Sequence, residues 1–197
     1  MTAADPNSQR MGEIIFRQVE QMERLIGAIL DLSSLERGRL QMTHSRVELL
    51  RVIELAVEEC RSALESKSQR LILNIPEQPL AVQGDELRLV QIVRTLLDNA
   101  VKFTADGGSI HLSIAGIGSQ AQIQVRDTGR GLTPTDLSRL FDPFVLASTA
   151  QAEAGIGVSL NIARHLAELH NGTLTAASAG PGQGSQFCVS LPLATPS

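Results

Sequence analysis

The sequence lacks the features that define several large functional classes. Its 197 residues carry a formal charge of -4, and the basic residues are scattered, so no nucleic-acid surface is expected. It has only two cysteines, Cys60 and Cys188, with no CxxC pair and no histidine-rich tract, which argues against disulfides and zinc. No apolar run reaches the roughly 20 residues of a membrane-spanning helix. We therefore expect a soluble, cytoplasmic chain that makes no membrane contact itself, whether or not a parent protein is membrane-anchored.

What the sequence does contain is enough apolar residues, 43%, for one sizeable core and an additional element. The additional element is a helix over about residues 11–40. Its apolar residues are spaced 4, 3, 4, 3, typical of a helix that packs on other helices in coiled-coil fashion: Ile15, Val19, Met22, Ile26 and Ile29. The spacing alone does not identify what the helix packs against. The alternative to a helical bundle is an ordinary amphipathic helix that lies on the core of the same domain.

The remaining chain alternates between strand and helix patterns. Helices are predicted over about 49–66, 86–103 after a cap at Asp85, and 156–170. Strands are predicted near Val47 and over 70–75, 80–82, 110–114, 123–125, 173–178 and 186–191, and the middle, 127–154, is rich in loops. This order predicts an α+β two-layer sandwich, in which helices cover one face of a mixed, mostly antiparallel sheet.

The end of the second of these helices breaks its own pattern. Residues 96–104 read LLDNAVKFT, which begins as a buried apolar face. Asn99, Lys102 and Phe103 are three and four positions apart, so they project to one side of the helix. A polar helix end, a solvated lysine and a core phenylalanine would explain them without a function. The helix pattern alone does not distinguish this explanation from a binding site.

Two glycine motifs follow, and each is weak when taken alone. Residues 127–132, DTGRGL, end a predicted strand, and an Asp-Thr-Gly turn is common because the aspartate can bond its own backbone. Residues 155–160, GIGVSL, open a helix. Such a glycine pair is either a tight helix entry or a way to bring backbone amides close to phosphate oxygens.

Taken in order, the motifs resemble a known family. LLDNAVKF, DTGRGL, LFDPF at 140–144, GIGVSL and GQGSQFCVSLPL at 182–193 resemble the boxes of the catalytic ATP-binding domain of sensor histidine kinases. That domain, with its Bergerat-type fold, belongs to a superfamily that includes gyrase, heat-shock chaperones and mismatch-repair proteins. Residues 22–40, MERLIGAILDLSSLERGRL, resemble the second helix of the kinases' dimerisation and phosphotransfer bundle. The resemblance implies that residues 1–43 are that helix and 44–197 the catalytic domain.

The resemblance also implies roles around magnesium and phosphate. The oxygen of Asn99 would coordinate Mg2+, a hard cation that prefers oxygen ligands. Lys102 would contact phosphate. Gly155 and Gly157 would present backbone amides to the phosphates. Thr95, with Asn99 and Lys102, completes the expected catalytic set. It stands where the family usually has a second asparagine, and because of this replacement we expect weaker positioning of metal and water there.

Further roles concern the base of ATP. Asp127 would accept a hydrogen bond from the adenine amino group and so select the base. Phe103 would pack beside the nucleotide. Gly129 and Gly131 would let the base and the backbone of the lid come close, and Ser185 would support Asp127 through water. The lid between Phe141 and Gly155 contains no lysine or arginine, so charge neutralisation would fall to magnesium, Lys102 and Arg130.

One family feature is absent from the sequence. The acceptor histidine lies in an H-E/D-x-R/K-x-P type motif, and none is present. The histidines are expected to be solvated or structural: His44, His111, His165 and His170. We expect a catalytic fragment that lacks the first bundle helix and transfers the ATP γ-phosphoryl to a histidine outside this chain.

The expected partners are ATP, a response-regulator receiver domain and a second copy of the chain, bound through the N-terminal helix. Autophosphorylation of this chain alone is not expected. Two alternatives stay open, namely a serine kinase of the anti-sigma-factor kind and a non-enzymatic docking module with a degenerate nucleotide site. The bundle-like helix counts against the first. Thr95 and the uncharged lid favour the second.

Overall fold

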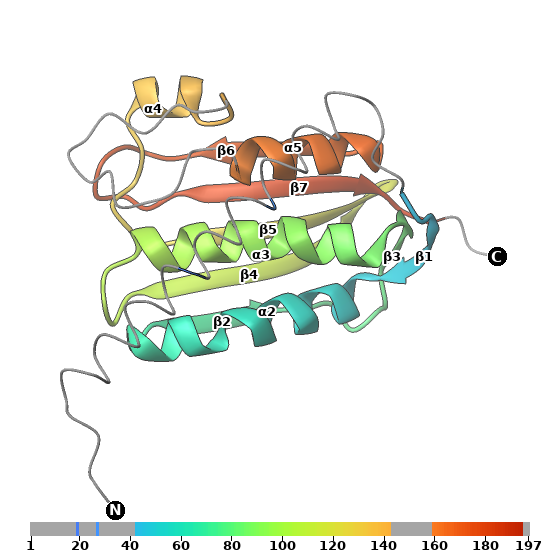
Figure 1. Cartoon of the computed structure of the whole chain (residues 1–197), viewed down its shortest axis with the longest axis horizontal. Coiled ribbons are helices and arrows are strands. Elements are labelled where there is room, and N and C mark those ends of the chain that lie inside the picture. The colour runs from blue at the N-terminus through green and yellow to red at the C-terminus, as the bar shows by residue number, and fades with distance from the viewer. Residues whose placement is uncertain (1–18, 20–26, 28–41, 143–158, 195–197) are drawn as a thin grey trace, which may run out of the picture.

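The computed structural model describes residues 42–142 and 159–194, together with Val19 and Gly27 (Figure 1). In chain order its elements are β1 (Ser45–Glu48), α2 (Leu49–Ser66), β2 (Arg70–Asn74), β3 (Ala81–Gly84), α3 (Glu86–Phe103), β4 (Ser109–Ile117), β5 (Gln120–Asp127), α4 (Pro134–Arg139), α5 (Ser159–Leu169), β6 (Thr173–Ala177) and β7 (Gln186–Pro192). The predicted coiled-coil seam over residues 11–40 lies outside the described residues, apart from Val19 and Gly27.

The strands form one large sheet and one small one. The large sheet has the order β2-β4-β5-β7-β6; β2 runs parallel to β4, and all other neighbours are antiparallel. β1 and β3 form a separate antiparallel pair. Helices α2, α3 and α5 lie side by side on one face of the large sheet (Figure 1). This confirms the predicted two-layer sandwich with a mixed, mostly antiparallel sheet.

The hydrophobic core lies between the helices and the sheet, with α3 at its centre. α3 contacts α2 on one side, α5 on the other and β5 below. Its buried residues recur every three or four positions: Leu89, Val93, Leu96, Leu97 and Ala100. The strands beneath alternate buried and more exposed positions, as a sheet with one covered face requires. The apolar stripe fixes which way α3 faces, so its polar residues lie along the other side.

The segment after β5 contains a helix that the sequence analysis assigned to loop. α4 begins at Pro134, and Thr133 caps it. The Thr133 hydroxyl accepts from the amide of Asp136 at 3.1 Å, and the Asp136 carboxylate accepts from the amide of Thr133 at 3.2 Å. Such a reciprocal box followed by proline is a local start signal that was present in the sequence. The loop prediction was therefore wrong for this short stretch.

The hairpin strands β4 and β5 are longer than predicted. The ladder continues through Ile117 and Gln120, and Gly118 turns the chain with φ of +60°. The polar residues near the turn do not alternate with large apolar ones, so periodicity alone did not extend the strands this far. Among the described helices, none is long and apolar enough to cross a membrane.

Candidate functional site

Asp127 is a buried carboxylate at the end of β5, with 3% of its surface exposed. Its Oδ1 accepts from the backbone amides of Gly129 at 2.8 Å and Ser185 at 3.3 Å. Its Oδ2 accepts from the Ser185 hydroxyl at 2.5 Å. Ser185 thus supports Asp127 as expected, but directly and not through water. Three donors hold the carboxylate in one orientation, and Oδ2, which accepts only one of them, can accept a further bond.

Glycines allow the turn after Asp127 to lie against its neighbours. A Cβ on Gly129 would collide with the Phe103 carbonyl oxygen, and a Cβ on Gly131 with that of Gly180. Gly131 also has φ of +67°, which glycine adopts at little cost. We expected these two glycines to make room for a base and a lid. In the described part of the chain, both make room for the protein's own backbone.

Gly184 has a similar role that the sequence analysis missed. Its φ is +70°, and a Cβ there would collide with the carbonyl oxygen of Asp127. Gly184 lies in the GQGSQF motif one residue before Ser185, so the motif carried the signal. Its use is visible only once β5 and β7 are paired.

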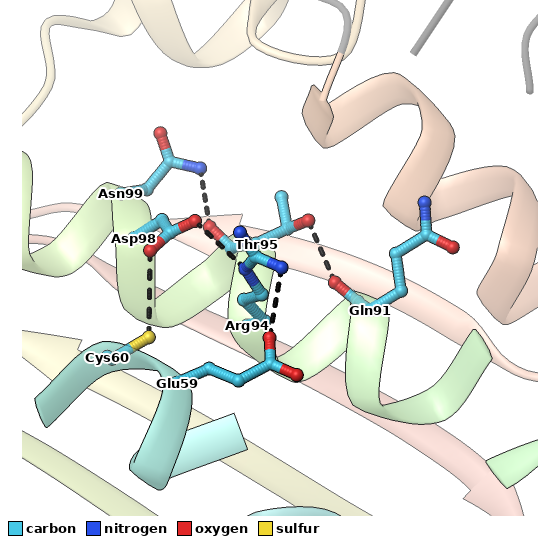
Figure 2. A network of polar contacts seen from close by, with 7 residues as sticks. All are labelled: Glu59, Cys60, Gln91, Arg94, Thr95, Asp98 and Asn99. Atoms are coloured by element: carbon cyan, nitrogen blue, oxygen red, sulfur yellow. Dashed lines mark hydrogen bonds and ion pairs between the residues drawn. The ribbon is translucent and has the colours of Figure 1, made fainter. Parts of the chain in front are cut away.

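Asn99 lies on the side of α3 away from the core and is half-buried. Its Nδ2 donates to the carbonyl of Thr95 at 2.8 Å, which orients the amide so that Oδ1 points away from the helix (Figure 2). The Thr95 hydroxyl donates to the carbonyl of Gln91 at 2.8 Å. An outward-facing amide oxygen fits the ligand that a hard cation such as Mg2+ prefers. The structure therefore gives Asn99 a geometry compatible with its expected role.

A polar network joins this part of α3 to α2 (Figure 2). Arg94 contacts Glu59 at 2.9 Å and Asp98 at 3.6 Å. The Cys60 thiol donates to Asp98 Oδ1 at 3.6 Å. Burial, and secondarily the Asp98 charge, raises the pKa of Cys60 to about 12, so the thiol keeps its proton and remains a donor. The network fixes the helix turn that precedes Asn99.

Lys102 and Phe103 meet Arg130 at the end of α3. The Arg130 guanidinium carbon lies 4.3 Å from the centroid of the Phe103 ring, and Lys102 Nζ lies 4.9 Å from it, both within cation–π range. Burial lowers the pKa of Lys102, and the charge of Arg130 lowers it further. A cavity of about 550 Å³ opens here, and Lys67 and Gly129 also line it. Two cations beside one ring favour an anionic ligand.

The predicted site residues are only partly brought together. The cavity adjoins Lys102, Phe103 and Gly129, while Asn99 and Asp127 do not line it. Gly155, Gly157 and all of the lid after Asp142 lie outside the described residues. Where the structure describes the chain, no group of three or more histidine, cysteine or acidic side chains could hold a metal, so the magnesium hypothesis depends on Asn99.

The residues that flank the lid are anchored to α5. Asn161 Nδ2 donates to the carbonyl of Phe141 at 2.9 Å, and the Arg164 guanidinium lies 5.4 Å from the centroid of the Phe141 ring. These contacts hold Phe141, which belongs to the described part of the LFDPF motif, beside α5.

The histidines fall into two groups. His44, His111 and His165 are exposed. His170, 3% exposed, accepts from the amide of Asp85 at 3.0 Å through Nε2, and its Nδ1 lies 2.7 Å from the Leu166 carbonyl. This arrangement requires a neutral ring with the proton on Nδ1. His170 therefore has a structural role, as the sequence analysis expected for it.

The sequence analysis did not single out Lys67 and Gln69, which contact the end of α3. They follow α2 in an ordinary polar turn, and nothing local to them points to α3.

Comparison with known proteins identifies the family. The family model described as histidine kinase-, DNA gyrase B-, and HSP90-like ATPase matches residues 84–195, and the chain belongs to this family. It is 36% identical to the adaptive-response sensory kinase SasA of Crocosphaera subtropica over 177 residues. This alignment covers 89% of this chain and 46% of SasA. It is 35% identical to the sensor histidine kinase RcsC of Escherichia coli over 173 residues. This alignment covers 86% of this chain and 18% of RcsC. The chain thus spans less than half the length of these relatives.

A solved structure shows the same fold. Full-length ShkA in complex with AMPPNP matches with a TM-score of 0.82 at 23% identity, over 100% of this chain and 41% of ShkA. The family resemblance that the sequence motifs predicted is confirmed.

Proposed function

We propose that this chain is the ATP-binding catalytic portion of a sensor histidine kinase. The complete enzyme would transfer the γ-phosphoryl group of ATP to a histidine nitrogen outside this chain and release ADP, chiefly by positioning and charge stabilisation. The names of SasA and RcsC support this proposal, as does the family match. The observation that carries it is the buried Asp127 carboxylate, held by Ser185 and Gly129 beside the polar end of α3.

Asp127 would select the base of the nucleotide. Its carboxylate can accept a hydrogen bond from the exocyclic amino group of adenine, whereas guanine offers an acceptor at that edge and would be repelled. The ShkA structure is a complex with AMPPNP, and we extend adenine-nucleotide binding to this chain. Phe103 would pack beside the nucleotide.

The phosphates would meet Lys102 and the amides of Gly155 and Gly157, and Arg130 would add positive charge. Asn99 would hold Mg2+ through its outward-facing Oδ1. Thr95, whose carbonyl accepts from Asn99 Nδ2, would be the third member of the catalytic set with Asn99 and Lys102. When bound, the metal would supply charge neutralisation for the phosphates. Lys102 suits phosphate contact because it already lies beside a second cation, so an anion would relieve their repulsion.

The organisation of the complete protein is part of the proposal. Residues 1–43 would form the second helix of a dimerisation and phosphotransfer bundle, and residues 44–197 the catalytic domain. A second copy would pair through that helix, and the phosphoryl group would pass on to a response-regulator receiver domain. The relatives' names, which describe sensory kinases, support this arrangement. We expect such an assembly to work in the cytoplasm.

Calorimetric titration of ATP and GTP, with and without Mg2+, tests the proposal. Asp127→Asn should weaken ATP binding by about ten- to a hundredfold, because a charge-assisted acceptor is lost. Glu77→Gln, which changes an exposed carboxylate in the same way, should leave affinity unchanged. Asn99→Ala should reduce only the magnesium-dependent part of binding.

Equal ATP affinity in wild type and Asp127→Asn would show that Asp127 does not recognise the adenine base. No ATP binding by the wild-type protein would favour the docking-module alternative. A uniform loss in Asn99→Ala, with and without the metal, would give Asn99 a structural role instead.

A further inference from the structure

Both lysines of the chain, Lys67 and Lys102, lie at the same end of α3. The sequence has 17 basic residues and only these two are lysine. Lys102 is in the last turn of α3. Lys67 follows α2, and its Nζ donates to the carbonyls of Val101 at 2.9 Å, Lys102 at 3.1 Å and Thr104 at 3.4 Å. The ammonium of Lys67 is therefore directed at backbone oxygens of α3.

Gln69 contacts the same turn. Its Nε2 donates to the carbonyls of Val101 at 3.0 Å and Thr104 at 2.8 Å, and the residue is 8% exposed. A buried amide placed among carbonyls is strongly directional, because both its hydrogens and the carbonyls need partners away from water. Lys67 and Gln69 thus form a pair of donors that we call the α3 clamp.

The α3 clamp meets a general need of helix ends. The last carbonyls of a helix have no partner within the helix, and a cation near them interacts favourably with the helix dipole. At the end of α3 the Phe103 carbonyl accepts from the amide of Arg130 at 3.2 Å. The Val101 and Lys102 carbonyls accept from the α3 clamp. The backbone of both expected site residues, Lys102 and Phe103, is therefore fixed from outside the helix.

We propose that Lys67 and Gln69 are positioning residues, which hold the last turn of α3 so that Lys102 and Phe103 stay beside Arg130. The identity of the ligand that binds this turn depends on the proposed function, whereas the positioning role of Lys67 and Gln69 does not. Lys67 acts through the helix backbone, since its ammonium is committed to three carbonyls.

The side chains of the α3 clamp are separable from the fold around them. Backbone bonds already tie this segment to the turn after α3: Gly107 donates to the Lys67 carbonyl at 2.9 Å, and Arg70 donates to the Gly108 carbonyl at 2.9 Å. Lys67 is half-buried at the C-terminal end of α2. Variants that remove only the side-chain donors should therefore still fold.

Lys102 itself reports whether the clamp positions it. Burial, and then the charge of Arg130, lowers the pKa of Lys102. A frayed last turn would move the amine into water and away from Arg130. Its pKa would then rise toward 10.5, the ordinary value for lysine. A role confined to stability would leave this pKa unchanged in the folded protein.

NMR of protein labelled with carbon-13 lysine measures that pKa, because only two side-chain signals are present and removal of Lys67 assigns them. Lys67→Met and Gln69→Leu should both raise the pKa of Lys102, and Lys67→Arg, which keeps charged donors, should restore it. Gln69→Leu is the decisive variant because it changes no charge. A rise in Lys67→Met alone would be a charge effect and would overturn the clamp, as would no rise in either variant.

Nucleotide titration of the same variants gives the second readout. We expect ATP and ADP to bind about three- to tenfold more weakly in Lys67→Met and Gln69→Leu, with both nucleotides affected alike, because the whole turn is displaced. A lower melting temperature with unchanged affinity and unchanged pKa would assign the pair a purely structural role. If wild-type protein binds no ATP, the proposed function fails. The NMR titration then still shows whether the α3 clamp positions Lys102.

Discussion

The two ends of α3 are held by opposite kinds of contact. At the N-terminal end, acceptors bind backbone amides: Asp85 Oδ1 accepts from the amide of Arg88 at 3.2 Å, Asp85 Oδ2 from that of Thr43 at 3.0 Å, and His170 from that of Asp85 at 3.0 Å. At the C-terminal end, donors bind backbone carbonyls, and these come from Lys67, Gln69 and the amide of Arg130. Each end receives the chemistry that its unpaired groups require.

The difference lies in what each end carries. The N-terminal end holds no expected site residue, and its contacts join the segment before β1 to the end of α5. The C-terminal end carries Asn99, Lys102 and Phe103. The Arg130 amide bonds the turn after Asp127 to this end, and Gly129 lies close against the Phe103 carbonyl. We infer that disturbing the first end changes mainly stability, whereas disturbing the second changes ligand binding out of proportion to stability.

The largest effect is expected where the turn after Asp127 meets the C-terminal end. A Cβ introduced by Gly129→Ala would collide with the Phe103 carbonyl and approach Asp127 Oδ1. The turn would have to retreat, which breaks the bond from the Arg130 amide to Phe103. We expect a stability loss of about 1–3 kcal/mol and at least a tenfold loss of ATP affinity, measured by urea denaturation and calorimetry.

Gly116→Ala is the matched control. Gly116 lies in β4, and a Cβ there would meet only the flexible end of the Leu80 side chain, at 3.3 Å. This variant should keep both stability and affinity near the wild-type values. Equal affinity in Gly129→Ala and wild type would show that the turn tolerates displacement and would remove the contrast between the two ends.

The second effect is expected at the N-terminal end. Asp85→Ala removes the cap of α3 and the acceptor for Thr43, and such a loss destabilises by about 0.5–2 kcal/mol. Asp85→Ser keeps a capping oxygen and should recover much of this stability. Urea denaturation measures both variants. ATP affinity should stay within about twofold of wild type in the folded protein, and a tenfold loss would mean that the two ends are coupled through the helix.

The same contrast explains what the sequence could predict. The apolar stripe of α3 and its cap at Asp85 are local patterns, and they predicted the helix correctly. The motif order predicted the family, and the resemblance predicted that Ser185 supports Asp127 through water. Lys67, Gln69 and Gly184 were missed because their partners are distant in sequence and are backbone atoms, which leave no residue pattern. The water expected between Ser185 and Asp127 was wrong because Gly184 lets β7 approach closely enough for a direct bond.

The weakest expected effect concerns how stability depends on pH at the N-terminal end of α3. Burial, and after it the nearby His44 charge, lowers the pKa of His170, while the Leu166 carbonyl and Asp85 act to raise it; the net shift is downward from 6.5. Well above pH 6.5 the ring is neutral in both folded and unfolded protein, so it adds no pH dependence. Below that pH the unfolded chain takes up a proton that the folded protein resists. Stability is therefore lost as pH falls.

His170→Gln tests this, since glutamine can accept from the Asp85 amide yet does not titrate. Its stability curve between pH 6.5 and 5.5 should be flatter than that of wild type, by at most ~1.4 kcal/mol over that unit. His111→Gln, at an exposed position on β4, should leave the wild-type slope in place. Urea denaturation at several pH values measures the slopes. A slope as steep in His170→Gln as in wild type would mean that another group senses pH, and that His170 fixes the N-terminal end of α3 by shape alone.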